Sequence, residues 1–115
     1  MSGKTIAIVD DNQDLLNSYS ETIKMSGYKV KSFTDPLLAY SDISTNPKKY
    51  SLLITDFLMP KMNGLLLATK LVEINQKLKI IIMNDVYNLK SDYKFKILKK
   101  PISVSTLYKA INKII

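Results

Sequence analysis

The sequence predicts a doubly wound α/β fold, in which helices cover both faces of an open sheet of parallel strands. Short apolar runs alternate with segments of helical periodicity along all 115 residues, as expected for consecutive βα units. Several of these runs are continuously apolar, which is typical of parallel strands buried on both faces. The length fits a single domain, residues 1–115, built around one core. Right-handed crossovers between five such units would give the open sheet.

The first predicted strand, residues 5–9, is a continuous apolar run that two aspartates close. A helix should follow, because either Asp11 or Asn12 can cap its first turn and Gly27 is placed to end it. The apolar residues of this segment recur at helical spacing: Leu15, Leu16, Tyr19 and Ile23.

Residues 28–33 alternate between apolar and polar side chains, which predicts an edge strand with one solvated face. Asp35 and Pro36 then begin a second helix, which should end before Asn46. A third strand is predicted over residues 51–55, where apolar residues lead directly to an aspartate.

The second half repeats the pattern, with a helix beginning near Gly64, strands over residues 78–83 and 95–98, and a last helix capped by Ser103. The apolar face of the helix near Gly64 is expected to comprise Leu65, Leu66, Ala68, Leu71, Val72 and Ile74. That of the last helix is expected to comprise Val104, Leu107, Tyr108, Ile111, Ile114 and Ile115.

One connection is shorter than the others. Only 11 residues, 84–94, separate the fourth and fifth predicted strands, against about 18 between the first and second and between the second and third. A parallel crossover together with its helix needs at least about 10–12 residues. The fourth helix is therefore predicted to be shortened or missing.

Composition excludes several classes of chemistry. The chain has no cysteine and no histidine, which excludes disulfides, thiolate nucleophiles, the usual zinc sites, Ser-His-Asp triads and histidine phosphorylation of this chain. No apolar run is long enough for a membrane span, and no signal peptide is recognisable. We therefore expect a soluble cytoplasmic protein that uses carboxylates, hydroxyls, amides and lysines.

The net charge of +7 is concentrated in one part of the chain, since residues 77–115 hold nine lysines and only two aspartates. A solvated surface is the favoured interpretation, and an acidic protein partner stays open. Nucleic acid is disfavoured because the chain has no arginine. Residues 86–100 do interleave lysines with Tyr87, Tyr93 and Phe95, a pattern seen at single-stranded nucleic-acid sites. We expect instead that Phe95 faces the core beneath the two tyrosines.

Carboxylates follow two of the predicted strands, where parallel strands place ligand sites. Asp10 and Asp11 come after the first strand, and Asp56 comes after the third. If these strands are neighbours, their ends lie roughly 5 Å apart. Three negative charges so close repel one another unless a cation is present. Carboxylate oxygens are ligands that Mg²⁺ prefers, so a magnesium site associated with phosphoryl chemistry is predicted.

Lys100 completes this set, since it ends the fifth predicted strand about two strand spacings from Asp56. Its ammonium could neutralise a transferred phosphoryl group. Such a site suits an aspartate nucleophile that forms an acyl phosphate.

Three motifs resemble those of the response-regulator receiver domain of two-component signalling, and the resemblance spans nearly the whole chain. They are VDDN at 9–12, TDFLMPKMNG at 55–64 and KP at 100–101. The resemblance implies a flavodoxin-like sheet of strand order 2-1-3-4-5. It also implies that Asp56 is the phosphoacceptor and that Lys100 contacts the phosphoryl group.

The same resemblance implies that Mg²⁺ is bound directly by Asp11 and Asp56, with Asp10 in support and Leu58 contributing its backbone carbonyl. It further implies a cis bond between Lys100 and Pro101, and a structural role for Met59, Pro60 and Gly64.

Two departures from the family concern switching. Asn84 stands where the family usually has threonine or serine, although its amide can still donate a hydrogen bond to a phosphoryl oxygen. Ile97 stands at the usual aromatic position on the fifth strand and is expected to be a core residue. Together with the short fourth connection, these residues predict an altered or absent conformational relay.

Two further positions concern the lifetime of an acyl phosphate. In receivers these positions help to admit the hydrolytic water, and here they are occupied by the apolar residues Leu58 and Val86. Apolar groups offer a water no hydrogen bond, so slow self-dephosphorylation is the hypothesis. Packing alone would explain the same two residues and stays open.

The expected function is that of a stand-alone receiver, which accepts a phosphoryl group on Asp56 from a histidine kinase or phosphotransfer protein and acts by associating with another, unknown protein. It would catalyse only its own phosphorylation and slow dephosphorylation. The alternative is a pseudo-receiver, an interaction module that phosphorylation does not control. A haloacid-dehalogenase-type phosphatase is disfavoured, because Leu58 stands where that class has a second acid.

Overall fold

The computed structural model describes residues 4–85 and 95–115, which form a five-stranded parallel sheet of order β2-β1-β3-β4-β5. The strands are β1 (Thr5–Val9), β2 (Lys29–Phe33), β3 (Tyr50–Asp56), β4 (Lys79–Asn84) and β5 (Lys96–Lys99). The helices are α1 (Gln13–Met25), α2 (Pro36–Thr45), α3 (Gly64–Ile74) and α4 (Val104–Ile114). The doubly wound class and the strand order 2-1-3-4-5 are confirmed.

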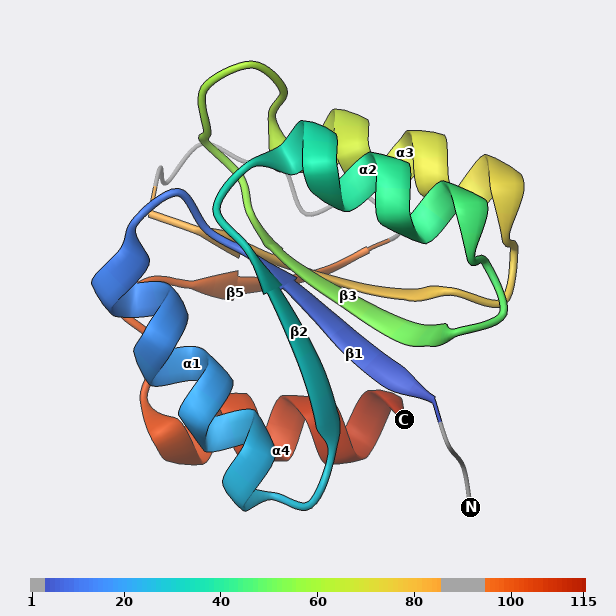
Figure 1. Cartoon of the computed structure of the whole chain (residues 1–115). Coiled ribbons are helices and arrows are strands. Elements are labelled where there is room, and N and C mark those ends of the chain that lie inside the picture. The colour runs from blue at the N-terminus through green and yellow to red at the C-terminus, as the bar shows by residue number, and fades with distance from the viewer. Residues whose placement is uncertain (1–3, 86–94) are drawn as a thin grey trace.

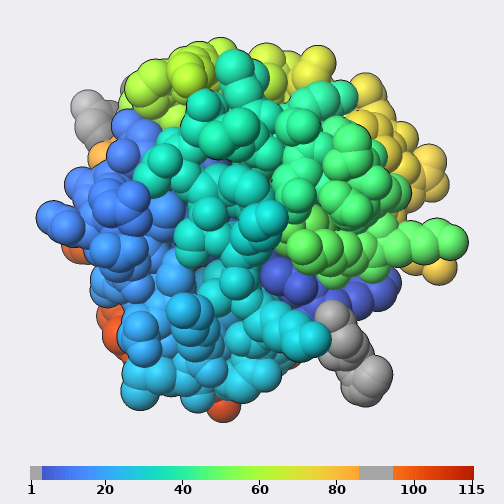
Figure 2. Space-filling model, viewed as in Figure 1, coloured from blue at the N-terminus to red at the C-terminus, as the bar shows by residue number. Residues whose placement is uncertain are grey.

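Helices cover both faces of the sheet (Figure 1): α2 and α3 lie on one face, and α1 and α4 lie on the other. Each pair encloses its own apolar cluster against the sheet. All five residues of β1 are buried, because this strand lies inside the sheet and is covered on both faces. In the space-filling view (Figure 2), the side chains of α1, β2 and α2 cover most of this side of the molecule.

Polar side chains cap the helices as the sequence predicts. Asn12 rather than Asp11 caps α1, because its side-chain oxygen accepts a hydrogen bond of 3.1 Å from the Leu15 N–H. Asp35 caps α2, with Pro36 as the first helical residue, and Ser103 caps α4. Gly27 follows α1 with φ +94°, a backbone conformation that L side chains rarely adopt. Because Asn12 rather than Asp11 caps α1, the Asp11 side chain is not used in capping that helix.

The predicted apolar faces of α3 and α4 are partly wrong. On α3, Leu67 is fully buried, whereas Leu66 and Ile74 are 48% and 44% exposed. Three consecutive leucines leave the rotation of that helix undetermined by sequence, and the structure selects the stripe through Gly64, Leu67, Ala68 and Leu71. On α4, Leu107 and Ile111 face the sheet, but Val104, Tyr108 and Ile115 are 65%, 46% and 53% exposed. On each helix, the residues buried against the sheet are fewer than the apolar residues of that helix.

The described residues contain four helices, which fits the expectation of a shortened or missing fourth crossover helix. Residues 86–94, where that crossover was predicted, lie outside the described residues, as do Val86, Tyr87 and Tyr93. Phe95 is described and is half-buried against the cluster beneath α2 and α3. Across residues 4–85 and 95–115, no helix is both long and apolar enough to cross a membrane.

Candidate functional site

Three carboxylates meet at the carboxyl ends of β1 and β3. The two strands are neighbours, with Val9 paired to Thr55, so Asp10 and Asp56 follow adjacent positions. One oxygen from each of Asp10, Asp11 and Asp56 lies within 4.8 Å of the others. The structure thus brings together the acids that the sequence predicts at one edge of the sheet. Asp56 is the last residue of β3 rather than the first residue beyond it.

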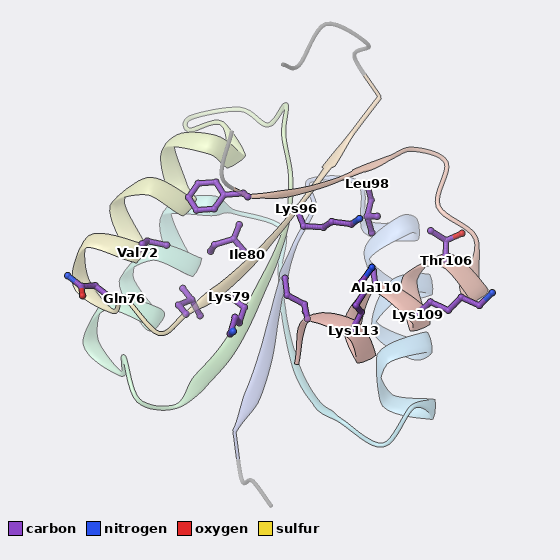
Figure 3. A pocket seen from close by; sticks show the side chains of 13 residues that line it. Val72, Gln76, Lys79, Ile80, Lys96, Leu98, Thr106, Lys109, Ala110 and Lys113 are labelled. Atoms are coloured by element: carbon purple, nitrogen blue, oxygen red, sulfur yellow. The ribbon is translucent and has the colours of Figure 1, made fainter. Parts of the chain in front are cut away.

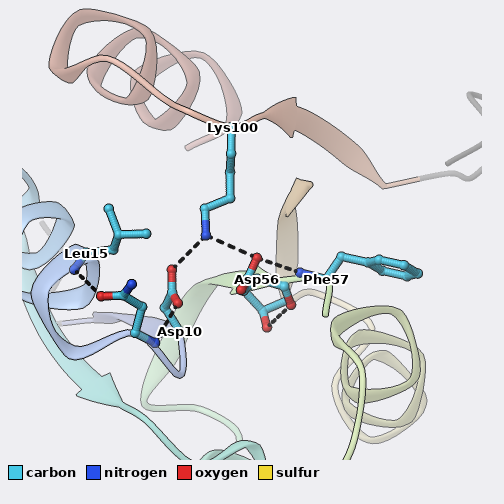
Figure 4. Close-up of polar contacts among 7 residues, drawn as sticks. Asp10, Leu15, Asp56, Phe57 and Lys100 are labelled. Atoms are coloured by element: carbon cyan, nitrogen blue, oxygen red, sulfur yellow. Dashed lines mark hydrogen bonds and ion pairs between the residues drawn. The ribbon is translucent and has the colours of Figure 1, made fainter. Parts of the chain in front are cut away.

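Asp10 is fully buried and is held on both of its oxygens (Figure 4). Its Oδ1 accepts a 2.9 Å hydrogen bond from the Asn12 N–H, and its Oδ2 accepts one of 3.2 Å from Lys100 Nζ. The turn that Asn12 makes in capping α1 therefore also fixes the Asp10 carboxylate. Asp11 is exposed beside it.

Asp56 presents two inequivalent oxygens. Its Oδ1 accepts hydrogen bonds of 3.3 Å from Lys100 Nζ and 3.1 Å from the Phe57 N–H (Figure 4). Within the described part of the chain, no hydrogen bond reaches its Oδ2. These contacts therefore orient the carboxylate through Oδ1 and leave Oδ2 without a hydrogen bond from the described residues.

Burial and neighbouring charge change the protonation of this site. Burial, and after it the negative charge of Asp10, raise the pKa of the Asp56 carboxyl to about 6, although Lys100 opposes both effects. Burial alone would lower the pKa of the Lys100 ammonium, but Asp10 and Asp56 outweigh that effect and raise it. Lys100 therefore stays positive, and it forms ion pairs with two of the three acids, Asp10 and Asp56.

The donor set fits a small divalent cation. Three ionised carboxylates and one ammonium leave two negative charges at the site. Oxygen ligands of this kind suit Mg²⁺, which is typically held by one or two carboxylates and keeps several of its waters. The exposed side chain of Asp11 leaves one side of the cluster open to solvent, where such waters would lie.

The loop after Asp56 returns closely to the strand end, and this requires a glycine. A Cβ on Gly64 would lie 2.1 Å from the Asp56 backbone oxygen, so α3 could not begin where it does with any other residue. Lys61 lies in this loop with φ 75° and forms a 2.8 Å ion pair with Asp35. This ion pair was not predicted, because nothing in the sequence distinguishes Lys61 from the other exposed lysines.

Asn84 and Lys100 complete the edge of the sheet. Asn84 ends β4 and is 5% exposed, and its backbone oxygen accepts a 2.9 Å hydrogen bond from the Lys100 N–H. The Lys100–Pro101 peptide bond is cis, as the resemblance implies. Tyr19 of α1, predicted only as an apolar helix residue, is buried close enough to this site for Lys100 and Asp10 to influence its hydroxyl, although burial is the main reason that its pKa is raised.

The apolar residues at the positions associated with switching and with acyl-phosphate lifetime differ in their environments. Leu58 is 53% exposed, so the packing alternative is wrong for this residue. Ile97 is half-buried against the cluster beneath α2 and α3, which is consistent with the expected core position. Val86 lies outside the described residues.

Comparisons with known proteins agree with this geometry. The family model described as the response regulator receiver domain matches residues 6–112. The response regulator receiver protein CpdR of Brucella abortus is 31% identical over 118 residues, which cover 97% of each chain. A putative two-component response regulator of Arabidopsis thaliana, ARR21, is 31% identical over 83 residues, or 72% of this chain and 14% of that protein. A receiver-domain structure from Clostridium thermocellum superposes with a TM-score of 0.88 at 22% identity, covering 96% of this chain and 93% of that one.

Proposed function

This chain belongs to the response regulator receiver domain family of two-component signalling, and from that premise we propose that Asp56 accepts a phosphoryl group from a histidine kinase or phosphotransfer protein. The observation that carries the proposal is the convergence of Asp10, Asp11, Asp56 and Lys100 at one edge of the sheet. The proposal includes a cytoplasmic location and output by association with another protein.

The proposed reaction is an in-line displacement. An Asp56 oxygen forms a bond to the phosphorus of the donor as the phosphorus–nitrogen bond of phosphohistidine breaks, and the departing imidazole takes up a proton. Oδ2 is the proposed nucleophile, since Oδ1 already accepts hydrogen bonds from Lys100 and Phe57. The Lys100 ammonium, 3.3 Å from Asp56, would stabilise charge on the transferred oxygens. The chain catalyses no other reaction in this proposal.

The residues proposed to hold Mg²⁺ are Asp11 and Asp56, with Asp10 in support and the backbone carbonyl of Leu58 as a further ligand. When bound, the ion would neutralise charge on the phosphoryl oxygens. Asp10 accepts hydrogen bonds from the Asn12 N–H and from Lys100, which fix its carboxylate in the cluster, where its negative charge would attract a cation. Asn84 is proposed to donate its amide to a phosphoryl oxygen.

Incubation with acetyl phosphate and Mg²⁺, followed by intact-mass spectrometry, tests the proposal. The wild-type chain should gain the mass of one phosphoryl group, and the Asp56→Asn variant should gain none. Glu73→Gln serves as the matched control, because Glu73 is an exposed acid on α3 away from the cluster, and this variant should be labelled like the wild type. Equal labelling of the wild type and Asp56→Asn would refute Asp56 as the acceptor.

The second candidate function is that of a pseudo-receiver, favoured by Asn84 and Ile97 at positions associated with switching. The same experiment separates the two functions. A pseudo-receiver would take up no label from acetyl phosphate in the presence of Mg²⁺.

The exposure of Leu58 leads to a prediction about the lifetime of the acyl phosphate. Leu58→Asn should accelerate its decay several-fold, because an amide beside Asp56 can orient a water that leucine cannot. Decay is followed by mass spectrometry after removal of acetyl phosphate. Leu66→Asn is the matched control, since Leu66 is 48% exposed on α3, and it should leave the rate unchanged. An unchanged rate in Leu58→Asn would refute the hypothesis of slow dephosphorylation through Leu58.

A further inference from the structure

The loop between Asp56 and Gly64 is tied to the start of α2 by the side chain of Lys61. Lys61 Nζ donates a 2.8 Å hydrogen bond to Asp35 Oδ2 and forms an ion pair with it. Within residues 4–85 and 95–115, no other side chain of residues 57–63 makes a hydrogen bond or ion pair beyond the loop and α3. Asp35 itself is fixed by a second contact, because its Oδ1 accepts a 2.9 Å hydrogen bond from the Leu37 N–H.

The backbone at Lys61 has a conformation that lysine rarely adopts. Its φ is 75°, and the Met62 N–H donates a 2.8 Å hydrogen bond to the Pro60 oxygen, which closes a tight turn around Lys61. Three-residue turns with a positive φ are rare and strained. Glycine would adopt this φ without strain, but it has no side chain that could reach Asp35. The presence of lysine here is therefore better explained by its side chain than by its backbone.

The ion pair joins the two segments that flank the end of β1. In the sheet, β1 lies between β2 and β3; Asp35 follows β2, and Lys61 follows β3. The end of β2 also holds the acidic cluster, because the Phe33 oxygen accepts a 3.1 Å hydrogen bond from the Asp10 N–H. The segment from Phe33 to Asp35 therefore contacts the backbone of Asp10 and, through Lys61, the loop that follows Asp56.

We propose that the Lys61–Asp35 ion pair holds the loop after Asp56 in the position that magnesium binding requires. The inference rests on the proposed function, in which Asp56 and the backbone carbonyl of Leu58 are ligands. Lys61 is a positioning residue, because its ammonium binds Asp35 and not a proposed ligand. A loop without this contact has more conformational freedom to lose when the ion binds, so the affinity for Mg²⁺ falls.

Charge and position predict opposite effects at Lys61. Removal of a positive charge would by itself tighten the binding of a divalent cation, and removal of the Asp35 carboxylate would weaken it. Loss of the loop position weakens binding in both cases. Lys61→Met therefore separates the two explanations, because only the loss of position makes this variant bind Mg²⁺ more weakly.

Lys31 provides a control for the loss of an ion pair. It pairs with Asp42 at 3.5 Å, and its side chain is 46% exposed, against 56% for Lys61. This ion pair joins β2 to α2 and involves no residue of the loop after Asp56. Lys31→Met thus removes the same charge and a similar contact without releasing that loop.

Lys109 provides a control for the loss of charge alone. It lines a groove of about 810 Å³ that lies between α3 and α4, beside β5, and the lining includes none of the clustered carboxylates (Figure 3). Three further lysines surround the buried side chains of Leu78, Ile80 and Leu98 in this groove: Lys79, Lys96 and Lys113. None of the four lysines forms an ion pair within residues 4–85 and 95–115.

The experiment titrates the full chain with Mg²⁺ and obtains the dissociation constant from backbone amide chemical shifts. Lys61→Met and Asp35→Asn should each raise this constant about three- to fivefold, the range that a partly exposed ion pair can supply. The double variant should raise it no further, because both substitutions remove the same contact. Asparagine at position 35 can still cap α2, and Lys61→Arg, which keeps the charge, should bind Mg²⁺ like the wild type. Lys31→Met and Lys109→Met should change the constant less than about 1.5-fold.

Three results would overturn the inference: an unchanged or smaller dissociation constant in Lys61→Met, additive effects in the double variant, or equal weakening by Lys31→Met. Binding is measured without a phosphoryl donor, so the result does not depend on whether Asp56 accepts a phosphoryl group. A wild-type chain that shows no shifts with Mg²⁺ would refute the magnesium site of the proposed function. Wild-type binding that Lys61→Met does not weaken would refute only the positioning role of the ion pair.

Discussion

At the scale of single residues, Asp56 combines a buried position with a charge that the fold does not fully neutralise. It is 7% exposed, beside the fully buried Asp10, and Lys100 is shared between the two carboxylates. The pKa of about 6 that results means that ionising Asp56 costs the metal-free protein stability. An ionisable residue that lowers the stability of the fold in this way is better explained by a functional role than by a structural one.

This cost predicts that Asp56→Asn stabilises the metal-free protein by about 1–3 kcal/mol at pH 7. Because the pKa of Asp56 is higher in the folded than in the unfolded chain, the folded state binds the proton more tightly. Stability is therefore lost as pH rises from about 4 to about 6, and the gain from Asp56→Asn should vanish below about pH 4. Urea denaturation of the wild type and the variant in EDTA, at pH 7 and below pH 4, measures the difference in their free energies of unfolding. A variant less stable than the wild type at pH 7 would contradict the prediction.

At the scale of elements, the start of α3 is fixed by its approach to the end of β3. The Gly64 N–H donates a 2.7 Å hydrogen bond to the Phe57 oxygen, and the missing Cβ leaves room for the Asp56 carbonyl. The loop between them is also held by Lys61 and Asp35, which connect it to α2. The position of Asp56 thus depends on how two helices begin.

Gly64→Ala should therefore move the start of α3 and damage the site. We expect a loss of stability of about 1–3 kcal/mol or more, together with slower phosphoryl uptake. Gly27→Ala is the matched control: its φ of +94° makes alanine costly by about 1–2 kcal/mol, but its Cβ would meet nothing within 4 Å. It should lower stability and leave uptake unchanged. Urea denaturation and acetyl phosphate labelling measure both variants, and equal uptake in the two would contradict the role of Gly64.

The elements also show what sequence alone can predict. Strands and helix starts were predictable because continuous apolar runs and the capping residues Asn12, Asp35 and Ser103 are local signals. The rotation of α3 was not, because Leu65, Leu66 and Leu67 are equally apolar and only packing against the sheet distinguishes them.

The position of the candidate site was largely predictable from the sequence, since acids and a lysine at the ends of parallel strands must meet at one edge of the sheet. What escaped prediction were contacts between distant segments. The Lys61–Asp35 ion pair and the position of Tyr19 beside the site depend on how two helices pack. Likewise, the sequence located the lysine excess but not the apolar groove that it surrounds.

At the scale of the whole molecule, the sheet separates two regions of different charge. The carboxylates gather where β1 and β3 end, whereas the lysine-lined groove lies between α3 and α4 beside β5. A cation at the first region should stabilise the entire fold, because a ligand that binds only the folded chain shifts the unfolding equilibrium. This contribution is about 1.4 kcal/mol when the free ion is at ten times its dissociation constant.

The melting temperature should accordingly rise with Mg²⁺ concentration, as measured by thermal unfolding. Asp11→Asn should weaken this response, since it removes a proposed direct ligand. Asp14→Asn, an exposed acid in the first turn of α1, is the control and should respond like the wild type. If Asp11→Asn and the wild type respond equally to Mg²⁺, Asp11 is not a ligand.

The most direct measurement of the central claim is ¹⁹F NMR of beryllofluoride, a phosphoryl mimic, mixed with the protein. If Asp10, Asp11 and Asp56 share one magnesium ion and leave an Asp56 oxygen to accept a phosphoryl group, resonances of bound beryllofluoride will appear only when Mg²⁺ is present, and they will be absent from Asp56→Asn. Bound resonances that persist in Asp56→Asn, or none in the wild type at saturating Mg²⁺, would contradict that claim.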